Sequence, residues 1–149
     1  MSLSVKVMTA LKEAMKSKDQ TALTALRAVK SAILLAQTES GAKEELTEEQ
    51  ELKLLQKQVK QRKDSAAVFL EQGREDLASP ELAEAEVISQ FLPEAMTEED
   101  IAKVVEATIA KVGATNMKDM GKVMGLVSQE LAGKADGKTI SNIVKAKLA

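Results

Sequence analysis

The sequence contains neither cysteine nor histidine among its 149 residues. Without cysteine the chain forms no disulfide bond and offers no thiol nucleophile. The absence of both residue types also removes the usual ligands of zinc sites and the imidazole that most often serves in acid–base catalysis. We therefore predict no metal site and no cofactor.

Aromatic residues are almost absent, since Phe69 and Phe91 are the only two and the chain has neither tryptophan nor tyrosine. The core must be built from aliphatic residues and methionine, which favours helices because strands prefer aromatic and β-branched residues. Stacking of bases on aromatic rings is nearly unavailable, so any contact with nucleic acid would depend on shape and backbone.

Long apolar runs are also missing, and no stretch could span a bilayer as a helix. Near the start, Lys6, Lys12 and Glu13 interrupt the apolar residues, so the pattern of a secretory signal is not present. From these features we expect a cytoplasmic protein without a membrane partner.

Apolar residues recur at steps of three and four along most of the chain, which predicts an all-α fold. The first predicted helix runs from Leu3 to Lys16, with Leu3, Val7, Leu11 and Met15 facing the core. Six more predicted helices, counted with their capping residues, cover residues 19–39, 47–72, 79–91, 97–113, 117–131 and 136–148.

Capping patterns support these helix ends. Thr47 and Gln50 form a capping-box pattern at the start of the third helix, and Ser79-Pro80 predicts the start of the fourth. Gly41 and Gly73 follow the second and third helices, where a left-handed residue commonly ends a helix.

Pro93 prevents the fourth helix from continuing and divides the chain into two regions. We predict an N-terminal helical domain with a long antiparallel hairpin at residues 1–93, and a compact three-helix tail at residues 94–149. The hairpin is expected between the second and third helices, because the short connection at Gly41 makes neighbouring helices antiparallel.

That pairing would place Arg27 and Lys30 beside Lys57 and Lys60, as a second basic patch. Two interpretations stay open. The patch could hold phosphates through its charge, or it could be a solvated face, which such runs of charge more often are. In the second interpretation, the stem of Arg62 would lie over the core.

Carboxylates gather in one stretch, at Glu44, Glu45, Glu48, Glu49 and Glu51. Negative charge at the start of a helix is favourable because it complements the helix dipole. The chain also has no nucleophile motif and no phosphate-loop pattern. We therefore interpret these residues as a solvated face and predict no catalytic residue.

The tail is basic, although the whole chain has a net charge of −2. From Lys111 onward there are seven lysines and three acidic residues, a net charge of +4, against −6 for the remainder. This asymmetry indicates an anionic partner for the tail.

Two glycines, Gly121 and Gly125, fall on one face of a predicted tail helix, where each costs about 1 kcal/mol relative to alanine. They either admit a neighbouring helix or leave room for a phosphate backbone, and the two interpretations are compatible. The candidate nucleic-acid-binding residues of the tail are Lys118, Gly121, Lys122, Gly125, Lys134, Lys138 and Lys145.

Several segments carry a family resemblance. They are Leu26-Arg27, Lys30-Ser31-Ala32-Ile33, Arg62-Lys63-Asp64-Ser65, Gln90-Phe91-Leu92-Pro93, Lys118-Asp119-Met120-Gly121-Lys122-Val123-Met124-Gly125 and Gly133-Lys134-Ala135-Asp136-Gly137-Lys138. This pattern resembles the YqeY family over nearly the whole chain, and its last part is similar to the tail domain of GatB. GatB is a subunit of the glutamine-dependent aminoacyl-tRNA amidotransferase. In that enzyme the tail helps to hold tRNA, while activation and amide transfer occur elsewhere.

The resemblance implies an all-helical module that binds tRNA or another structured RNA and has no catalytic site of its own. One alternative is an accessory component of glutamine-dependent tRNA amidotransfer, a carbon–nitrogen ligase activity, with an amidotransferase or a synthetase as partner. Another alternative is a protein-interaction adaptor that uses the helical hairpin and the small-residue face.

Overall fold

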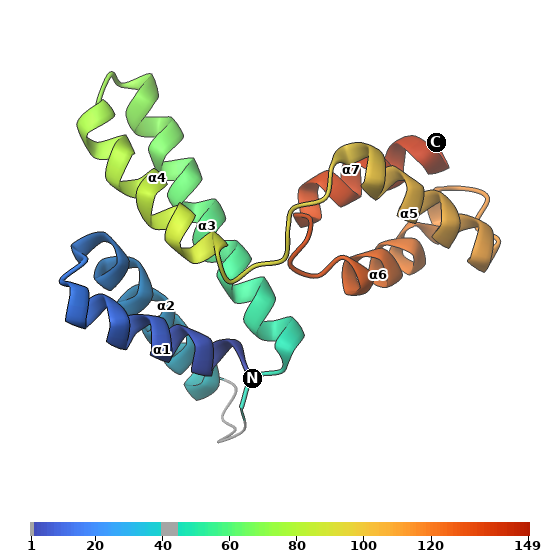
Figure 1. The fold of residues 1–149 in the computed structure, drawn as a ribbon. Coiled ribbons are helices and arrows are strands. Elements are labelled where there is room, and N and C mark those ends of the chain that lie inside the picture. Colours follow the sequence, from blue (N-terminus) through green and yellow to red (C-terminus); the bar gives the residue numbers. More distant parts are fainter. Residues whose placement is uncertain (1, 40–44) are drawn as a thin grey trace. The chain divides into compact units, whose positions relative to one another are not determined.

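The computed structural model describes residues 2–39 and 45–149, and these residues contain helices and no strand (Figure 1). The predicted all-α class is confirmed. The helices are α1 (Leu3–Ser17), α2 (Gln20–Glu39), α3 (Glu48–Glu71), α4 (Glu75–Ser89), α5 (Glu98–Val112), the 3-10 helix η1 (Met117–Asp119), α6 (Met120–Glu130) and α7 (Gly137–Leu148). The chain divides into two compact units, Met1–Leu92 and Pro93–Ala149, called unit 1 and unit 2 below.

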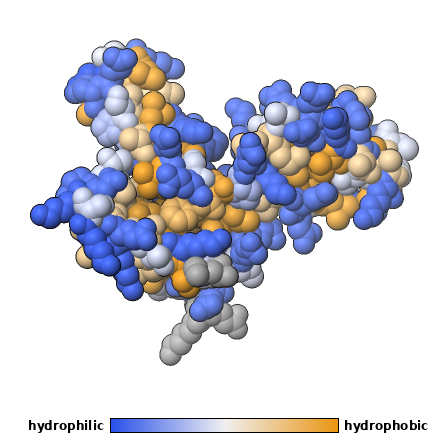
Figure 2. Space-filling model, viewed as in Figure 1, coloured by the Kyte–Doolittle hydropathy of each residue, from blue (hydrophilic) through white to orange (hydrophobic). Residues whose placement is uncertain are grey.

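Unit 1 begins with the antiparallel pair α1 and α2, joined by two residues. Lys18 ends α1 in the left-handed conformation, with φ 58°, and the side chain of Asp19 accepts a hydrogen bond from the backbone N–H of Ala22 at 3.1 Å. Both helices bury an aliphatic stripe in one core, which also takes in Leu55 and Val59 of α3. Apolar side chains also reach the surface of unit 1, beside the hydrophilic residues of these helices (Figure 2).

The predicted inward face of α1 is wrong at one position. Leu3, Val7 and Leu11 are buried as expected, but Met15 is 57% exposed and Ala14 is buried in its place. A helix turns about 100° per residue, so three steps of four residues rotate the side chain by about 120° away from the starting direction. Ala14 returns to within about 20° of Leu3 and therefore faces the core.

The long hairpin of unit 1 consists of α3 and α4, which pack along each other over most of their length (Figure 1). The sequence predicts α2 as the partner of α3, and this prediction is wrong, because α2 packs mainly on α1 and α4. Small buried residues explain the pairing: Ala66 of α3 and Ala78 and Ala85 of α4 allow the two backbones to approach closely. Gly41, which the prediction uses as the turn, lies outside the described residues.

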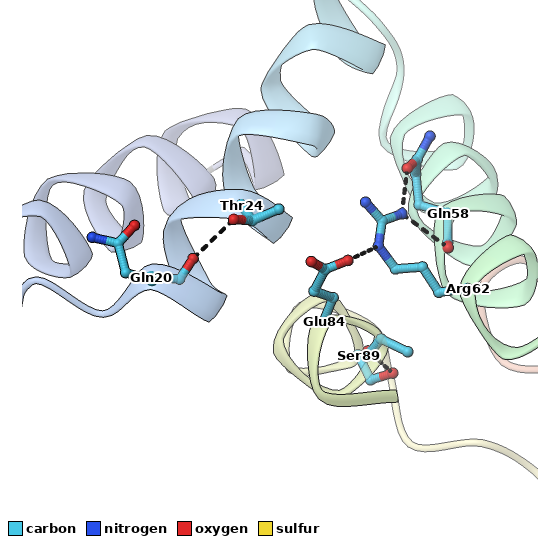
Figure 3. A network of polar contacts seen from close by, with 7 residues as sticks. Gln20, Thr24, Gln58, Arg62, Glu84 and Ser89 are labelled. Carbon is cyan, nitrogen blue, oxygen red and sulfur yellow. Dashed lines mark hydrogen bonds and ion pairs between the residues drawn. The ribbon is translucent and has the colours of Figure 1, made fainter. Parts of the chain in front are cut away.

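Arg62, which interrupts the apolar stripe of α3, makes polar contacts within the hairpin. Its Nε lies 3.3 Å from Glu84 Oε2 of α4, and its Nη1 donates to the side-chain oxygen of Gln58 at 2.8 Å (Figure 3). The side chains of Arg62 and Glu84 are only 13% and 17% exposed. Arg62 therefore links α3 to α4 through an ion pair. The sequence suggests only that its aliphatic stem would lie over the core.

Helix α4 starts earlier than the sequence predicts. Instead of beginning at Ser79-Pro80, it begins at Glu75 and carries Pro80 in its second turn. Gly73, with φ 70°, turns the chain after α3, and Ala78 is already buried against the hairpin partner. Packing along α3 thus compensates the hydrogen bond that Pro80 cannot donate.

Unit 2 is a three-helix arrangement of α5, α6 and α7 around eight buried aliphatic side chains. Thr97 caps α5 by accepting from the N–H of Asp100 at 3.2 Å, and Asp136 caps α7 by accepting from the N–H of Thr139 at 2.6 Å. Gly113 ends α5 in the left-handed conformation, with φ 69°. These three helix ends confirm the predicted ones.

Among the described residues, no helix is both long and apolar enough to cross a bilayer.

Candidate nucleic-acid interface

The direction of the helices in unit 2 decides which tail lysines come together. The short turn at residues 131–136 makes α6 and α7 antiparallel, so their N-termini lie at opposite ends of the unit (Figure 1). An 11-residue helix such as α6 is about 16 Å long. The candidate residues of the tail are therefore divided between two ends, and do not form one cluster.

One end is basic, and we call it the basic end. It combines the last turn of α5 with Lys111, the start of α6 with Lys118 and Lys122, and the last turn of α7 with Lys145. All four lysines are exposed, and in the described part of the chain none has a carboxylate within ion-pair distance. Sequence reasoning missed Lys111 as a site residue, although its place in the last turn of the preceding helix was a usable signal.

Two acidic residues lie at the basic end. Glu106 forms an ion pair with Lys147 at 2.6 Å, and the carboxylate of Asp119 accepts a hydrogen bond from the backbone N–H of Thr115 at 3.2 Å. Lys145 lies two residues from Lys147, about 160° around α7, so it projects away from α5. The two carboxylates offset only part of the positive charge, and this end keeps a net positive charge.

The opposite end holds Lys134 and Lys138 among carboxylates. The backbone N–H of Met96 donates to the carbonyl oxygen of Lys134 at 3.0 Å, which ties the turn to the segment that leads into α5. The start of α5, the end of α6 and the start of α7 meet there. The acidic residues at these helix ends are Glu98, Glu99, Asp100, Glu130 and Asp136. Lys134 and Lys138 thus lie in a predominantly acidic setting.

The glycine face of α6 is open. A Cβ atom added to Gly121 or Gly125 would have no other group within 4 Å, and both residues are exposed. Within the described residues, no neighbouring helix uses the room that these glycines leave. Of the two interpretations made from sequence, close packing by a neighbouring helix of unit 2 is therefore wrong, and the backbone beside Lys118 and Lys122 is left bare within this unit.

The residues of the second basic patch do not come together as predicted. Lys57 and Lys60 lie on the face of α3 opposite its buried stripe, and Lys60 pairs with Asp64 at 3.0 Å. Arg27 and Lys30 lie on the flank of α2, and Lys30 lines a cavity between α1 and α2. The register that joins the four residues depends on the α2–α3 hairpin, which the structure replaces by α3–α4.

The described ranges 2–39 and 45–149 contain no group of three carboxylates arranged to hold a metal ion. Glu51 is buried, but its Oε2 accepts a hydrogen bond from the backbone N–H of Ser4 at 2.9 Å, which anchors the start of α1. The chemistry that the surface supports best is therefore the electrostatic binding of an anion at the basic end.

Comparison with protein families adds a second line of evidence. A family model described as Yqey-like protein matches residues 4–148, nearly the whole chain. The chain belongs to the YqeY-like family. The resemblance found in the sequence is confirmed.

Individual relatives have related names. The chain is 32% identical over 144 residues to "Altered inheritance of mitochondria protein 41, mitochondrial" from Pyrenophora tritici-repentis, covering 92% of this chain and 78% of the relative. The protein of the same name from Kluyveromyces lactis is 34% identical over 142 residues, or 93% and 72% of the two chains. A subunit of the glutamyl-tRNA(Gln) amidotransferase from Thermococcus gammatolerans is 36% identical over 73 residues, 46% of this chain and 12% of the relative.

These names correct the predicted location. Three curated relatives are named as mitochondrial proteins, and this finding contradicts the expectation of a cytoplasmic protein. The expectation rested on the absence of long apolar runs and of a secretory-signal pattern, and neither feature distinguishes the cytoplasm from mitochondria.

Proposed function

We propose that this protein binds structured RNA, with tRNA as the principal ligand, through the basic end of unit 2. The observation that carries the proposal is that Lys111, Lys118, Lys122 and Lys145 lie at the same end of unit 2 and have no carboxylate partner in the described chain. Lysines that meet phosphates release counterions from the nucleic acid, and this release drives binding.

The helix geometry favours the same ligand. Lys122 lies in the first turn of α6, where a positive charge is unfavourable by roughly 0.3–1 kcal/mol because it opposes the helix dipole. A phosphate at this position would reverse the sign of that interaction. Gly121 and Gly125 leave the adjacent backbone bare, so a sugar–phosphate strand could approach closely.

The comparisons support RNA as the anion. One relative is named as a subunit of a glutamyl-tRNA(Gln) amidotransferase, and it aligns with almost half of this chain. The sequence has no tryptophan or tyrosine to stack bases. Recognition would therefore rest on the shape and backbone of a folded RNA, as in other proteins that contact phosphates and 2′-hydroxyls.

A filter-binding titration with tRNA at two salt concentrations tests the proposal. We expect the protein to bind tRNA more tightly than poly(U) of equal length. The double variant Lys118→Glu with Lys122→Glu should bind at least about tenfold more weakly, and its salt slope should fall by about two. Circular dichroism should show a folded variant that melts at the same temperature or slightly higher, because both side chains are exposed and a carboxylate in the first turn of α6 complements the helix dipole. Binding by the variant equal to that of the unaltered protein at both salt concentrations would refute the proposal.

A second candidate follows from the same relative: the protein could assist tRNA-dependent amidotransfer without catalysing it. This function requires the protein to change the rate at which a complete amidotransferase amidates charged tRNA. An amidation assay with and without saturating protein measures that rate, and an unchanged rate would exclude this role while leaving RNA binding intact.

A further inference from the structure

The α1–α2 pair of unit 1 carries a recess that the RNA-binding proposal does not use. A cavity of about 90 Å³ lies between the two helices, with Val7 and Met8 of α1 on one side and Lys30, Ile33 and Leu34 of α2 on the other. A cavity of roughly 150 Å³ accommodates benzene, so this recess has room for one aliphatic side chain and is too small for a cofactor.

Exposed apolar side chains lie in the recess and beside it. On α1, Ser4, Met8 and Met15 share one flank, and Met15 is 57% exposed. On α2 the facing flank carries Leu34, which is 53% exposed. Exposed side chains of this size along a groove between two helices form a surface into which the apolar ridge of a third helix packs.

Basic residues outnumber acidic ones beside this groove near the α1–α2 connection, where Asp19 is the acidic residue and accepts a hydrogen bond from the backbone N–H of Ala22. Because α1 and α2 are antiparallel and Met8 and Lys30 line the same recess, Lys12 of α1 lies about level with Arg27 of α2. Lys12, Arg27 and Lys30 are all exposed, and Glu13 lies on the opposite side of α1. At the other end, a neighbouring recess is lined by Glu45 and Glu51. The groove is thus apolar along its floor and basic at one end.

From this combination we infer that the α1–α2 groove docks an amphipathic helix of a partner protein, with acidic residues at the end that faces Arg27 and Lys12. One aliphatic side chain of the partner fills the recess between Met8 and Leu34. Acidic side chains of the partner pair with the three cations. A phosphate backbone would satisfy the cations but would gain nothing from the exposed Met15 and Leu34.

Two labelled synthetic peptides of 18 residues test this inference on the full chain. Both are amphipathic helices with leucine at positions i, i+3, i+4 and i+7. One carries glutamate on its flanks, and the other carries lysine at the same places. Fluorescence anisotropy measures binding, and methyl NMR spectra locate it. We expect the glutamate peptide to bind with a Kd below about 100 µM and to shift the methyl signals of Met8, Ile33 and Leu34.

Variants with matched charge changes sharpen the test. Leu34→Asp, and separately Arg27→Glu with Lys30→Glu, should each weaken the glutamate peptide at least about tenfold, and the charge-reversed variant should come to prefer the lysine peptide. Lys57→Glu with Lys60→Glu makes the same charge change on α3 and should leave binding unchanged. All five substituted residues of these three variants are exposed, and the far-ultraviolet spectrum checks that each variant folds.

Four results would overturn the inference. They are equal binding of the two peptides, no methyl shift at about 1 mM peptide, the same methyl shifts with anionic lipid vesicles in the absence of peptide binding, and loss of tRNA affinity in the Arg27→Glu, Lys30→Glu variant. The last two would assign the groove to a membrane surface or to the RNA footprint.

Discussion

The α3–α4 hairpin of unit 1 and the basic end of unit 2 differ in how many of their basic side chains pair with a carboxylate. In the α3–α4 hairpin of unit 1, four basic residues each pair with an acidic neighbour: Lys53 with Glu49, Lys60 with Asp64, Arg62 with Glu84 and Arg74 with Asp76. At the basic end of unit 2, Lys147 pairs with Glu106, and four other lysines have no acidic partner among the described residues. Paired cations maintain the fold or have little effect, whereas unpaired cations from three helices form a surface that attracts an anion.

The largest change in stability should come from Arg62→Met. The substitution leaves Glu84 largely buried without its partner, and we expect a loss of about 2–3 kcal/mol, less than for a fully buried pair because water still reaches both groups. Chemical denaturation of unit 1 measures this loss. The double variant Arg62→Met with Glu84→Leu should recover most of it, because no unpaired charge remains. Unchanged stability with weakened tRNA binding would instead make Arg62 a phosphate ligand.

A comparison of the two ends of unit 2 should give the next largest effect. The double variant Lys111→Glu with Lys145→Glu leaves α6 unaltered and should weaken tRNA binding about tenfold. Lys134→Glu with Lys138→Glu makes the same charge change at the acidic end and should weaken it less than about twofold. Filter binding at one fixed salt concentration measures both variants. Equal losses from the two pairs would show that the whole unit attracts RNA without a defined surface.

The glycine face should separate stability from binding. Gly121→Ala and Gly125→Ala meet no neighbouring atom and have no left-handed backbone to strain, so each should stabilise unit 2 by up to about 1 kcal/mol. If the RNA backbone approaches this face closely, the same substitutions should weaken tRNA binding severalfold. Thermal melting and filter binding on the same preparations decide the matter. Stabilisation without any loss of affinity would remove the glycines from the interface.

The smallest effect should come from the exposed pair near the tip of the hairpin. The hydrogen bonds from Arg74 lower the pKa of Asp76 below its ordinary value. A carboxyl group whose pKa is lowered by folding stabilises the native state above its unfolded pKa, and this contribution is lost as the pH falls through the folded pKa. Asp76→Asn should therefore lower Tm slightly at pH 7 and not at all near pH 2. Water screens this exposed pair, so a large change at pH 7 would contradict its surface role.

Local sequence signals predicted the helices well. The capping box at Thr47 and Gln50, the N-cap at Asp136 and the left-handed Gly113 all appear where the sequence places them, because each depends on residues within one turn. Pairings between helices were harder to predict. The hairpin of α3 with α4 depends on small buried residues such as Ala66 and Ala85, whose meeting no local pattern encodes.

The candidate site shows the same limit. Exposed lysines and bare glycines in the tail could be identified from the sequence, but their grouping depends on the antiparallel direction of α6 and α7. That direction brings Lys111 and Lys145 to the end where Lys122 lies, and it places Lys134 and Lys138 at the other end. Likewise, α2 and α3 do not form the predicted hairpin, so Arg27 and Lys30 do not join the predicted phosphate-binding patch. They lie instead beside the groove between α1 and α2.

A titration of ¹⁵N-labelled protein with tRNA, followed through the backbone amide signals, tests the central claim most directly. We predict that the signals of Lys111, Met117 to Gly125 and Lys145 shift or broaden first, at low salt and in proportion to bound RNA. The signals of Glu98 to Asp100 and of Lys134 to Lys138 should stay in place at the same ratio. Perturbation that begins at the acidic end, or no perturbation in unit 2 at saturating tRNA, would contradict the account.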